Sequence, residues 1–383
     1  MQMLENCGKD MDYTMAEKNL DFDRIIDRRN TKSIKYDWIA KKGMPEDTLP
    51  LWVADMDFQV SSYIQEALAR QTEHGIFGYS DVQETYFEIV KGWMERKHGW
   101  KVSEDWLVKT PSVVFALALA VKAFTEPGDS VLIQQPVYYP FQNIVDVNGR
   151  KMVSNDLVYE AGRYHIDFED FEEKVKEVKI FLLCSPHNPL GIVWTKEQLQ
   201  KMAEICIAND VLMVSDEIHS DLIFHGKKHI PTATVSEEIS GKIISCISGT
   251  KTFNLAGLQA STTVFPNAEM KAQYDAFWTS MDVHRNNAFS SVAMEAAFNE
   301  GEEWLEQLLG YIGGNFEFIK DYCAANIPQV KPNVPDATYL VWLDCRGLGM
   351  GNEELRDFMI RKAGLGLNEG WSFGRSLSGF MRL

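Results

Sequence analysis

Four short apolar runs that contain β-branched residues recur through the middle of the chain, with longer amphipathic segments between them. Runs of this length, bounded by polar turns, are typical of strands that are buried on both faces. Strands that alternate with helices predict an α/β fold, in which helices cover both sides of a mainly parallel sheet. The four predicted strands span residues 130–134, 180–184, 211–215 and 243–247.

One of the intervening segments, residues 195–209, has clear helical spacing. Thr195 and Gln198 have the spacing of a capping box, in which each side chain bonds the other residue's backbone N–H at the start of a helix. The apolar residues that share one face of this helix are Leu199, Met202, Ala203 and Cys206.

The pattern changes after about Phe289, where helix-like segments at 292–299 and 304–326 precede a short strand at 339–343. With 383 residues, the chain is long enough for more than one packed unit. We predict three parts: a loose polar leader at 1–18, a large domain at 51–288, and a small α+β domain made of 19–50 and 289–383.

Acidic residues outnumber basic ones by 55 to 38, which gives a formal net charge of −17. Such a chain is repelled by nucleic acids and anionic membranes, so we expect neither as a partner. The first residues lack the basic and apolar regions of a secretory signal, and no run reaches the ~18 apolar residues of a membrane helix. We therefore predict a cytoplasmic protein.

The six cysteines include no CxxC pair, and several lie in apolar runs. We predict buried free thiols rather than disulfides or a zinc site. The cysteines are Cys7, Cys184, Cys206, Cys246, Cys323 and Cys345.

Polar or aromatic residues follow each of the four predicted strands. The segments are 135–138, 185–188, 216–219 and 248–251. Because ligands of open α/β sheets bind at the carboxyl ends of the strands, this coincidence predicts a binding site there.

Lys251 and Asp216 carry the most specific chemistry at these strand ends. A lysine can form an imine with an aldehyde cofactor, and the hydroxyls of Ser248 and Thr250 can bind a phosphate. The alternative for Lys251 is a solvated surface charge. Asp216 closes a buried strand, which is costly without a partner such as a pyridinium nitrogen. The alternative for Asp216 is a helix N-cap.

Three further features fit the same ligand less specifically. Tyr138 can stack on an aromatic ring or simply pack. Asn188 can bond a ring oxygen or serve the turn Asn-Pro-Leu-Gly. Residues 112–114 precede a helical run at 115–124, whose first N–H groups can bind a phosphate or be an ordinary helix start.

Two other readings of the sequence are disfavoured. Five residues could be metal ligands, but their spacing fits no standard motif, so we expect no metal. The glycines of 347–351 lack the preceding strand and following helix of a dinucleotide site, so we predict a loop. The five candidate ligands are Asp216, Glu217, His219, Asp221 and His225.

Together, these segments resemble the fold type I pyridoxal-phosphate (PLP) enzymes, the aspartate aminotransferase superfamily. The order matches: an aromatic residue, Asn-Pro-x-Gly, Asp-Glu and Ser-x-Thr-Lys, with Asp216 and Lys251 separated by 251 − 216 = 35 positions. Finer similarity points to the MalY/PatB-type C–S lyases, the cystathionine β-lyases. It lies in segments 49–58, 75–79, 185–191, 215–221 and 251–259. The resemblance implies a sheet of the seven-stranded type.

The resemblance also implies roles for the cofactor-binding residues. Lys251 holds PLP as a Schiff base and later moves the Cα proton, and Asp216 pairs with the pyridine nitrogen. Asn188 bonds the ring's 3-oxygen, Tyr138 stacks on the ring, and His219 stands where aminotransferases commonly have Tyr. The phosphate is held by Val113, Val114, Ser248 and Thr250, the last at a position where many relatives have Ser.

Further residues are implied to bind the substrate and a second subunit. Arg382 binds the substrate α-carboxylate and Ala54 lines the same end of the pocket. Tyr79 takes part in catalysis and cofactor binding from the neighbouring subunit, which implies a homodimer with shared active sites. Relatives continue with another strand and helix after the position of Arg382, so either the sequence is cut at Leu383 or this tail is missing.

The resemblance implies α,β-elimination on L-cystathionine or related cysteine S-conjugates, which gives pyruvate, ammonia and a thiol such as homocysteine. The alternative enzyme is a class I/II aminotransferase, which shares the early steps. A non-catalytic regulatory role is the alternative outside enzymology.

Overall fold

A seven-stranded sheet lies at the centre of the computed structural model, which describes residues 20–82, 84–282, 287–374 and 377–383. The predicted leader at 1–18 and Cys7 lie outside the described residues. Strand β10 runs antiparallel to both neighbours, and the other adjacent strands are parallel. The mainly parallel α/β sheet is therefore confirmed. In spatial order, the strands are β2 (Leu107–Thr110), β10 (Ser261–Val264), β9 (Ile243–Ile247), β8 (Leu212–Asp216), β7 (Ile180–Cys184), β3 (Ser130–Ile133) and β4 (Lys151–Ser154).

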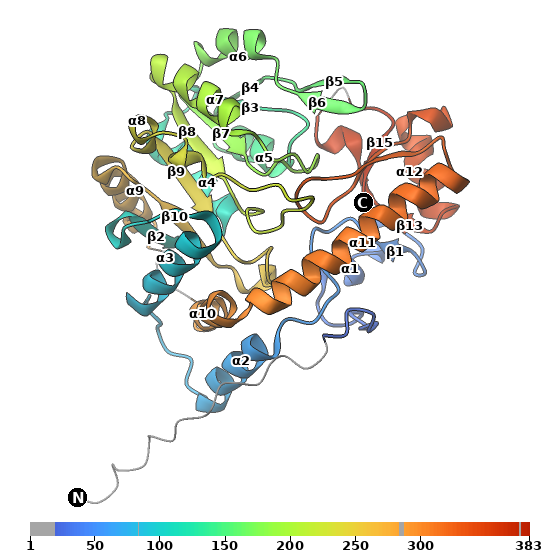
Figure 1. Ribbon diagram of the computed structural model, residues 1–383, viewed down its shortest axis with the longest axis horizontal. Coiled ribbons are helices and arrows are strands. Elements are labelled where there is room, and N and C mark those ends of the chain that lie inside the picture. The colour runs from blue at the N-terminus through green and yellow to red at the C-terminus, as the bar shows by residue number, and fades with distance from the viewer. Residues whose placement is uncertain (1–19, 83, 283–286, 375–376) are drawn as a thin grey trace, which may run out of the picture.

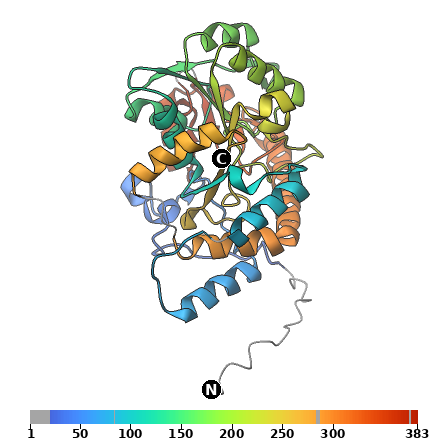
Figure 2. The same ribbon diagram turned by 90° about the vertical axis from the view of Figure 1, so that its left-hand side faces the viewer.

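Helices cover both faces of this sheet (Figures 1 and 2). Along β7, Ile180 and Leu182 pack with helices α4 (Val113–Phe124), α5 (Pro140–Val147) and α9 (Ala268–Ser280). Phe181 and Leu183 point the other way, into the core shared with α6 (Phe168–Val175), α7 (Lys196–Ala208) and α8 (Glu237–Ser240). Because side chains alternate along a strand, a sheet covered on both sides needs the continuous apolar runs seen in the sequence.

Helix α7 begins with the predicted capping box. The Gln198 backbone N–H donates to Thr195 Oγ1 at 3.2 Å, and the Thr195 N–H donates to Gln198 Oε1 at 2.9 Å. Each bond satisfies a backbone donor that has no partner within the helix.

A second sheet, four-stranded and antiparallel, is built from the C-terminal part of the chain. Its order is β11 (Lys331–Asn333), β12 (Trp342–Asp344), β15 (Phe380–Arg382) and β14 (Asn368–Glu369). Figure 1 shows the long helix α11 (Glu302–Asn326), in orange, running from α10 (Ser290–Glu300) toward α12 (Asn352–Arg361).

The strand predicted at 339–343 is displaced in the structure, where β12 spans Trp342–Asp344. Thr338 has a positive φ of 71°, and its hydroxyl oxygen accepts the Leu340 N–H at 3.1 Å. This local bond turns the chain, so Tyr339 leaves the ladder and reaches the site described below.

The glycine-rich segment 347–351 forms a loop, as predicted, but the reason given for it was wrong. Strand β12 precedes the loop and α12 follows it. The strand belongs to an antiparallel sheet, whereas a dinucleotide site requires a parallel strand before the loop.

The N-terminal segment joins the C-terminal part through β1 (Leu49–Pro50), which pairs in parallel with β13 (Leu365–Gly366). This pairing agrees with the grouping of 19–50 with 289–383, although the domain bounds stay a prediction. Figure 2 shows α2 (Ser62–His74) at the outer side of the molecule, next to α10. The remaining elements are α1 (Ile34–Asp37), α3 (Glu84–His98), a hairpin of β5 (Val158–Glu160) and β6 (Arg163–His165), and short 3₁₀ turns at Ala40–Lys42, Glu104–Trp106, Thr232–Thr234, Ala256–Leu258, Arg346–Leu348 and Gly370–Ser372.

Five of the six cysteines lie within the described residues, and all five are buried free thiols: Cys184, Cys206, Cys246, Cys323 and Cys345. Among the described residues, no helix is long and apolar enough to cross a membrane.

Candidate active site

The carboxyl ends of β7, β8 and β9 bring the predicted site residues to one edge of the central sheet. Asp216, the last residue of β8, is in register with Cys184 of β7 and Cys246 of β9. The loop after β3 joins the same edge, because the Tyr138 N–H donates to the Asn188 carbonyl at 2.9 Å. Segments far apart in sequence therefore meet where the strand ends predicted a site.

Asp216 is 4% exposed, and its Oδ1 accepts the Ile218 N–H at 3.1 Å. Burial raises the pKa of this carboxyl to about 7, and the neighbouring Glu217 charge adds to the effect. Among the described residues, no cationic group lies within ion-pair distance of it. The helix N-cap alternative is wrong, because residues 218–220 form a turn rather than a helix.

Lys251 follows β9 and is partly buried, so the surface-charge alternative is wrong. Its Nζ donates to the Ala54 carbonyl at 2.5 Å. Burial and, as a smaller effect, the positive charge of Arg382 together lower the pKa of this amine to about 8. About a tenth of the amine is therefore neutral at pH 7 and about half at pH 8, far more than for an ordinary lysine, as suits a nucleophile or base.

Two residues that the sequence did not single out hold the Ala54 carbonyl in place. Tyr339 Oη donates to the same carbonyl at 2.8 Å. The Asn254 amide bonds both sides of the adjoining backbone: its Nδ2 donates to the carbonyls of Met56 and Phe58 at 2.9 Å each, and its Oδ1 accepts the Met56 N–H at 3.1 Å. The loop that carries Lys251 is thereby fixed to the segment that faces it.

A charged cluster, also missed from the sequence, stiffens this facing segment. The Arg28 guanidinium bonds both oxygens of Asp55 at 2.9 Å, and its Nη1 lies 2.6 Å from Asp57 Oδ1. Lys35 Nζ lies 2.7 Å from Asp57 Oδ2. Two cations and two carboxylates neutralise one another next to Ala54. The signal in the sequence was the triplet Asp55-Met56-Asp57. Its basic partners, Arg28 and Lys35, lie twenty or more positions earlier in the chain.

Arg382 is 2% exposed in β15. Its Nη1 donates to Asn188 Oδ1 at 3.3 Å, and its Nη2 donates to the Trp52 carbonyl at 3.0 Å and to Asn368 Oδ1 at 2.5 Å. Burial lowers its pKa to about 10, so it stays charged at neutral pH. No carboxylate pairs with it among the described residues, and its Nε has no partner. The group can therefore take a substrate carboxylate.

The predicted phosphate-binding residues follow β2 and β9. Helix α4 begins at Val113, where the Ser112 hydroxyl accepts the Phe115 N–H at 3.2 Å. The Ser248 hydroxyl donates to the Ala260 carbonyl at 2.6 Å, so the Thr250 hydroxyl must donate to Ser248 across 2.8 Å. Val114 supplies the next N–H of α4. Thr250 would therefore have to turn its hydrogen outward in order to bond a phosphate.

The other predicted residues differ in exposure. His219 is 2% exposed with its Nδ1 unpartnered, and burial lowers its pKa to about 3, so the ring is neutral. Burial raises the pKa of Tyr138 to about 12, so its phenol is protonated. Tyr79, in contrast, is 96% exposed on this chain.

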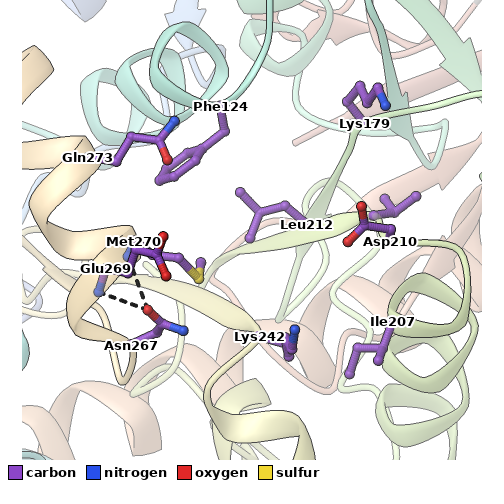
Figure 3. Close-up of a pocket in the computed structure, with 11 residues that line it drawn as sticks. Phe124, Lys179, Ile207, Asp210, Leu212, Lys242, Asn267, Glu269, Met270 and Gln273 are labelled. Carbon is purple, nitrogen blue, oxygen red and sulfur yellow. Dashed lines mark hydrogen bonds between the residues drawn. The ribbon is translucent and has the colours of Figure 1, made fainter.

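Two of the cavities in the described part of the chain lie at opposite ends of the central strands. One, of about 700 Å³, opens beside Lys251 and is walled by the Arg28–Asp55–Asp57 cluster and Asn254. Another, of about 480 Å³, lies at the amino ends of β7, β8 and β9, where Figure 3 shows Lys179, Leu212 and Lys242. None of the predicted site residues lines this second cavity. Among the described residues, no group of three or more His, Cys, Asp or Glu side chains is placed to hold a metal.

The arrangement fits PLP in its chemistry. A buried carboxyl without a cation suits a pyridine nitrogen, a partly buried amine suits an aldehyde, and the start of α4 suits a phosphate. A mainly parallel sheet with these groups at its carboxyl edge defines the class of fold type I PLP enzymes.

The sequence matches the family described as aminotransferase class I and II over residues 48–383, and the chain belongs to this family. It is 42% identical to the cystathionine beta-lyase PatB of Bacillus subtilis (strain 168), over 95% of each chain. Among solved structures, it is similar to PLP-containing cystalysin from Treponema denticola, with a TM-score of 0.92, 34% identity, and 96% and 94% of the two chains covered. It is also similar to the PLP-bound C–S lyase from Staphylococcus hominis, with a TM-score of 0.88, 32% identity, and 95% and 93% covered.

The lowered pKa of Lys251 makes a prediction about the cofactor-free protein. Only the neutral amine attacks an aldehyde, so the rate of PLP capture should rise with pH and level off above a midpoint near 8. The measurement is the growth of visible absorbance after PLP is added at a series of pH values. A midpoint near 10.5, the ordinary value for lysine, would contradict the proposed environment.

Proposed function

We propose that this chain is a PLP-dependent C–S β-lyase, which releases a thiol, pyruvate and ammonia from cysteine S-conjugates such as L-cystathionine. The observation that carries the proposal is the meeting of Lys251, Asp216 and Arg382 at one sheet edge, in a chain 42% identical to a cystathionine beta-lyase. The free, buried cysteines are typical of a reducing compartment, which supports a cytoplasmic location.

The proposed roles follow from the contacts. Asp216 would pair with the pyridine nitrogen, because that partner makes its buried carboxylate favourable. Asn188, Tyr138 and His219 would bind the ring, and the phosphate would take the first N–H groups of α4 with Ser248 and Thr250. When bound, PLP supplies an electron-accepting ring that stabilises negative charge at the substrate Cα.

The remaining steps belong to the protein. Arg382 binds the substrate α-carboxylate and so orients the Cα–H bond toward Lys251. The neutral Nζ of Lys251 removes that proton. The Cβ–S bond then breaks, its electron pair leaves with the sulfur as a thiolate, and one water completes the hydrolysis to pyruvate and ammonia. The Ala54 carbonyl, which accepts from both Lys251 Nζ and Tyr339 Oη, keeps the amine directed into the site.

The central test is pyruvate release from L-cystathionine by the PLP-loaded protein with no keto acid added. We expect sustained multiple turnover, and a loss of roughly 10³-fold or more in Lys251→Ala, because the base is removed. Turnover that survives in Lys251→Ala would overturn the proposal. Amino transfer to an added keto acid, without pyruvate release, would identify the aminotransferase alternative instead.

We also propose a homodimer in which Tyr79 reaches the partner's site. Tyr79 is 96% exposed, and the preceding Ile76 and Phe77 are 69% and 56% exposed. Phe77 packs on Phe289 with ring centroids 5.5 Å apart, which gives the loop an ordered apolar face. Such contiguous exposed apolar side chains are typical of a subunit interface.

Subunit mixing tests this arrangement. Tyr79→Ala and Lys251→Ala should each be nearly inactive, but chains mixed and reassembled should regain activity, because one site of the mixed dimer has both residues intact. Pyruvate release before and after mixing is the measurement. The control partner is the double variant Tyr79→Ala/Lys251→Ala, which should not restore Lys251→Ala, because neither chain then supplies the lysine. Activity that fails to return in verified mixed dimers would argue against shared sites.

The 700 Å³ cavity beside Lys251 is the proposed space for the leaving group. Arg28, Asp55 and Asp57 line the cavity, and Arg28 together with Lys35 behind them neutralises the two carboxylates, so this cluster adds little net charge to the wall. Arg24 and Lys32 also line the cavity, and neither has an acidic partner among the described residues. This excess of positive charge favours thioethers that carry a distal carboxylate, as cystathionine does.

Substrate selectivity tests this charge. Arg24→Ala and Lys32→Ala should each raise KM for L-cystathionine by about 3- to 10-fold, with little change for neutral S-methyl-cysteine, because an exposed ion pair contributes only about 1 kcal/mol. Arg29→Ala is the matched control, since Arg29 faces Asp27 outside the cavity. Equal changes in KM for both substrates would show that Arg24 and Lys32 do not bind the distal carboxylate.

A further inference from the structure

Two buried carboxylates lie behind the proposed site, and each accepts three hydrogen bonds. Glu217 is fully buried and bonds His229 Nε2 at 2.9 Å, the Thr232 N–H at 3.0 Å and Ser245 Oγ at 3.0 Å. Asp221, with a side chain 4% exposed, has the same number of partners. Those partners are His98 Nε2 at 2.8 Å, Thr252 Oγ1 at 2.8 Å and Trp93 Nε1 at 3.1 Å.

The two carboxylates belong to one connected network. The rings of His98 and His229 meet edge to face, with centroids 5.5 Å apart and planes at 90°. Burial acts to raise the pKa of Glu217 and Asp221, but the bonds and charge of these histidines outweigh it and hold both pKa values below their ordinary range. Both groups are therefore ionised inside the protein.

Each end of the network adjoins a residue of the proposed chemistry. Glu217 directly follows Asp216, and Thr252 directly follows Lys251. Trp93 reinforces the second end, because it donates to Asp221 and also packs against Phe253, with ring centroids 5.6 Å apart. The residues after Lys251 are thus held by a hydrogen bond and by packing.

Stability alone is a weak reason for such a network. Burying two carboxylates costs free energy, and apolar side chains of similar volume often stabilise a core as well or better. A carboxylate with three fixed donors does, however, define the position of each donor closely. The network therefore suits a role in placing the segments that bear Asp216 and Lys251.

We propose that Asp221 and Glu217 are positioning residues, which act through Thr252 and through the adjoining peptide to place Lys251 and Asp216 for cofactor capture and proton transfer. This inference rests on the proposed function for its catalytic half. Its other half, capture of PLP by Lys251, needs no substrate.

Thr252 offers the sharpest test, because valine keeps its shape and serine keeps its hydroxyl. In Thr252→Val, we expect PLP capture by the cofactor-free protein to slow about 10-fold, and kcat to fall about 10-fold with KM within about twofold. Thr252→Ser should stay within about twofold of the unmodified protein in the rate of PLP capture, in kcat and in KM. The double variant Thr252→Val/Asp221→Asn should be little worse than the more impaired single variant, because both substitutions disrupt the same hydrogen bond between Thr252 and Asp221.

Tyr86→Phe controls for a loss of stability without a loss of positioning. It removes a buried hydrogen bond of similar kind, from Tyr86 Oη to Thr262 Oγ1 at 3.1 Å, away from the network. It should lower Tm about as much as Thr252→Val does and leave capture and kcat unchanged. If Thr252→Val behaves like Tyr86→Phe, the network is structural only and the proposal is wrong. If the unmodified protein captures PLP normally but releases no pyruvate, the proposed function is contradicted instead.

Discussion

The structure depends on the burial of two ionisable groups, Asp216 and Lys251, at one edge of a parallel sheet. Burial raises the pKa of the carboxyl to about 7 and lowers that of the amine to about 8, so neither is well satisfied by the protein alone. A folded chain tolerates such groups when a ligand completes them. A cofactor with a cationic ring nitrogen and an aldehyde answers both needs.

The sheet makes this arrangement possible because both of its faces are covered. With helices on each side, ligands of such a sheet bind at the ends of the strands, and register places the ends of β7, β8 and β9 side by side. The rest of the site comes from elsewhere: Arg382 from the antiparallel sheet, and Ala54 from the segment held by Arg28 and Asn254. In the proposed function, the central sheet supplies the groups for the cofactor, and the other parts enclose the substrate.

Local patterns in the sequence predicted four of the seven strands of the sheet (β3, β7, β8 and β9), the start of α7, and the residues at those strand ends. Those features depend on neighbours within a few positions, as the Thr195–Gln198 capping box shows. The clamp by Asn254 spans 198 positions to Met56, and the bond from Arg382 to Trp52 spans 330. No short-range pattern encodes contacts of that length, so the network around Asp221 and the Arg28 cluster could not be predicted. The predicted position of β12 was wrong for the opposite reason: a single local turn at Thr338 overrode the strand preference of an apolar run.

A second lysine shows why burial alone does not define the reactive residue. Lys109 is 6% exposed, and burial also lowers its pKa to about 8. Its Nζ bonds the hydroxyls of Ser290 at 3.1 Å and Ser291 at 2.6 Å, and it does not line the cavity beside Lys251. Among the lysines that the structure describes, Lys251 alone combines the lowered pKa with the strand-end position, the Ala54 carbonyl and an open space.

The most direct measurement is therefore the site of cofactor attachment. PLP-loaded protein is reduced with borohydride, digested and mapped by mass spectrometry. The account predicts that the phosphopyridoxyl group is found on the peptide that contains Lys251, in one copy per chain, and that Lys251→Ala loses it. Modification of Lys109 or of exposed lysines instead, with Lys251 unlabelled, would contradict the account.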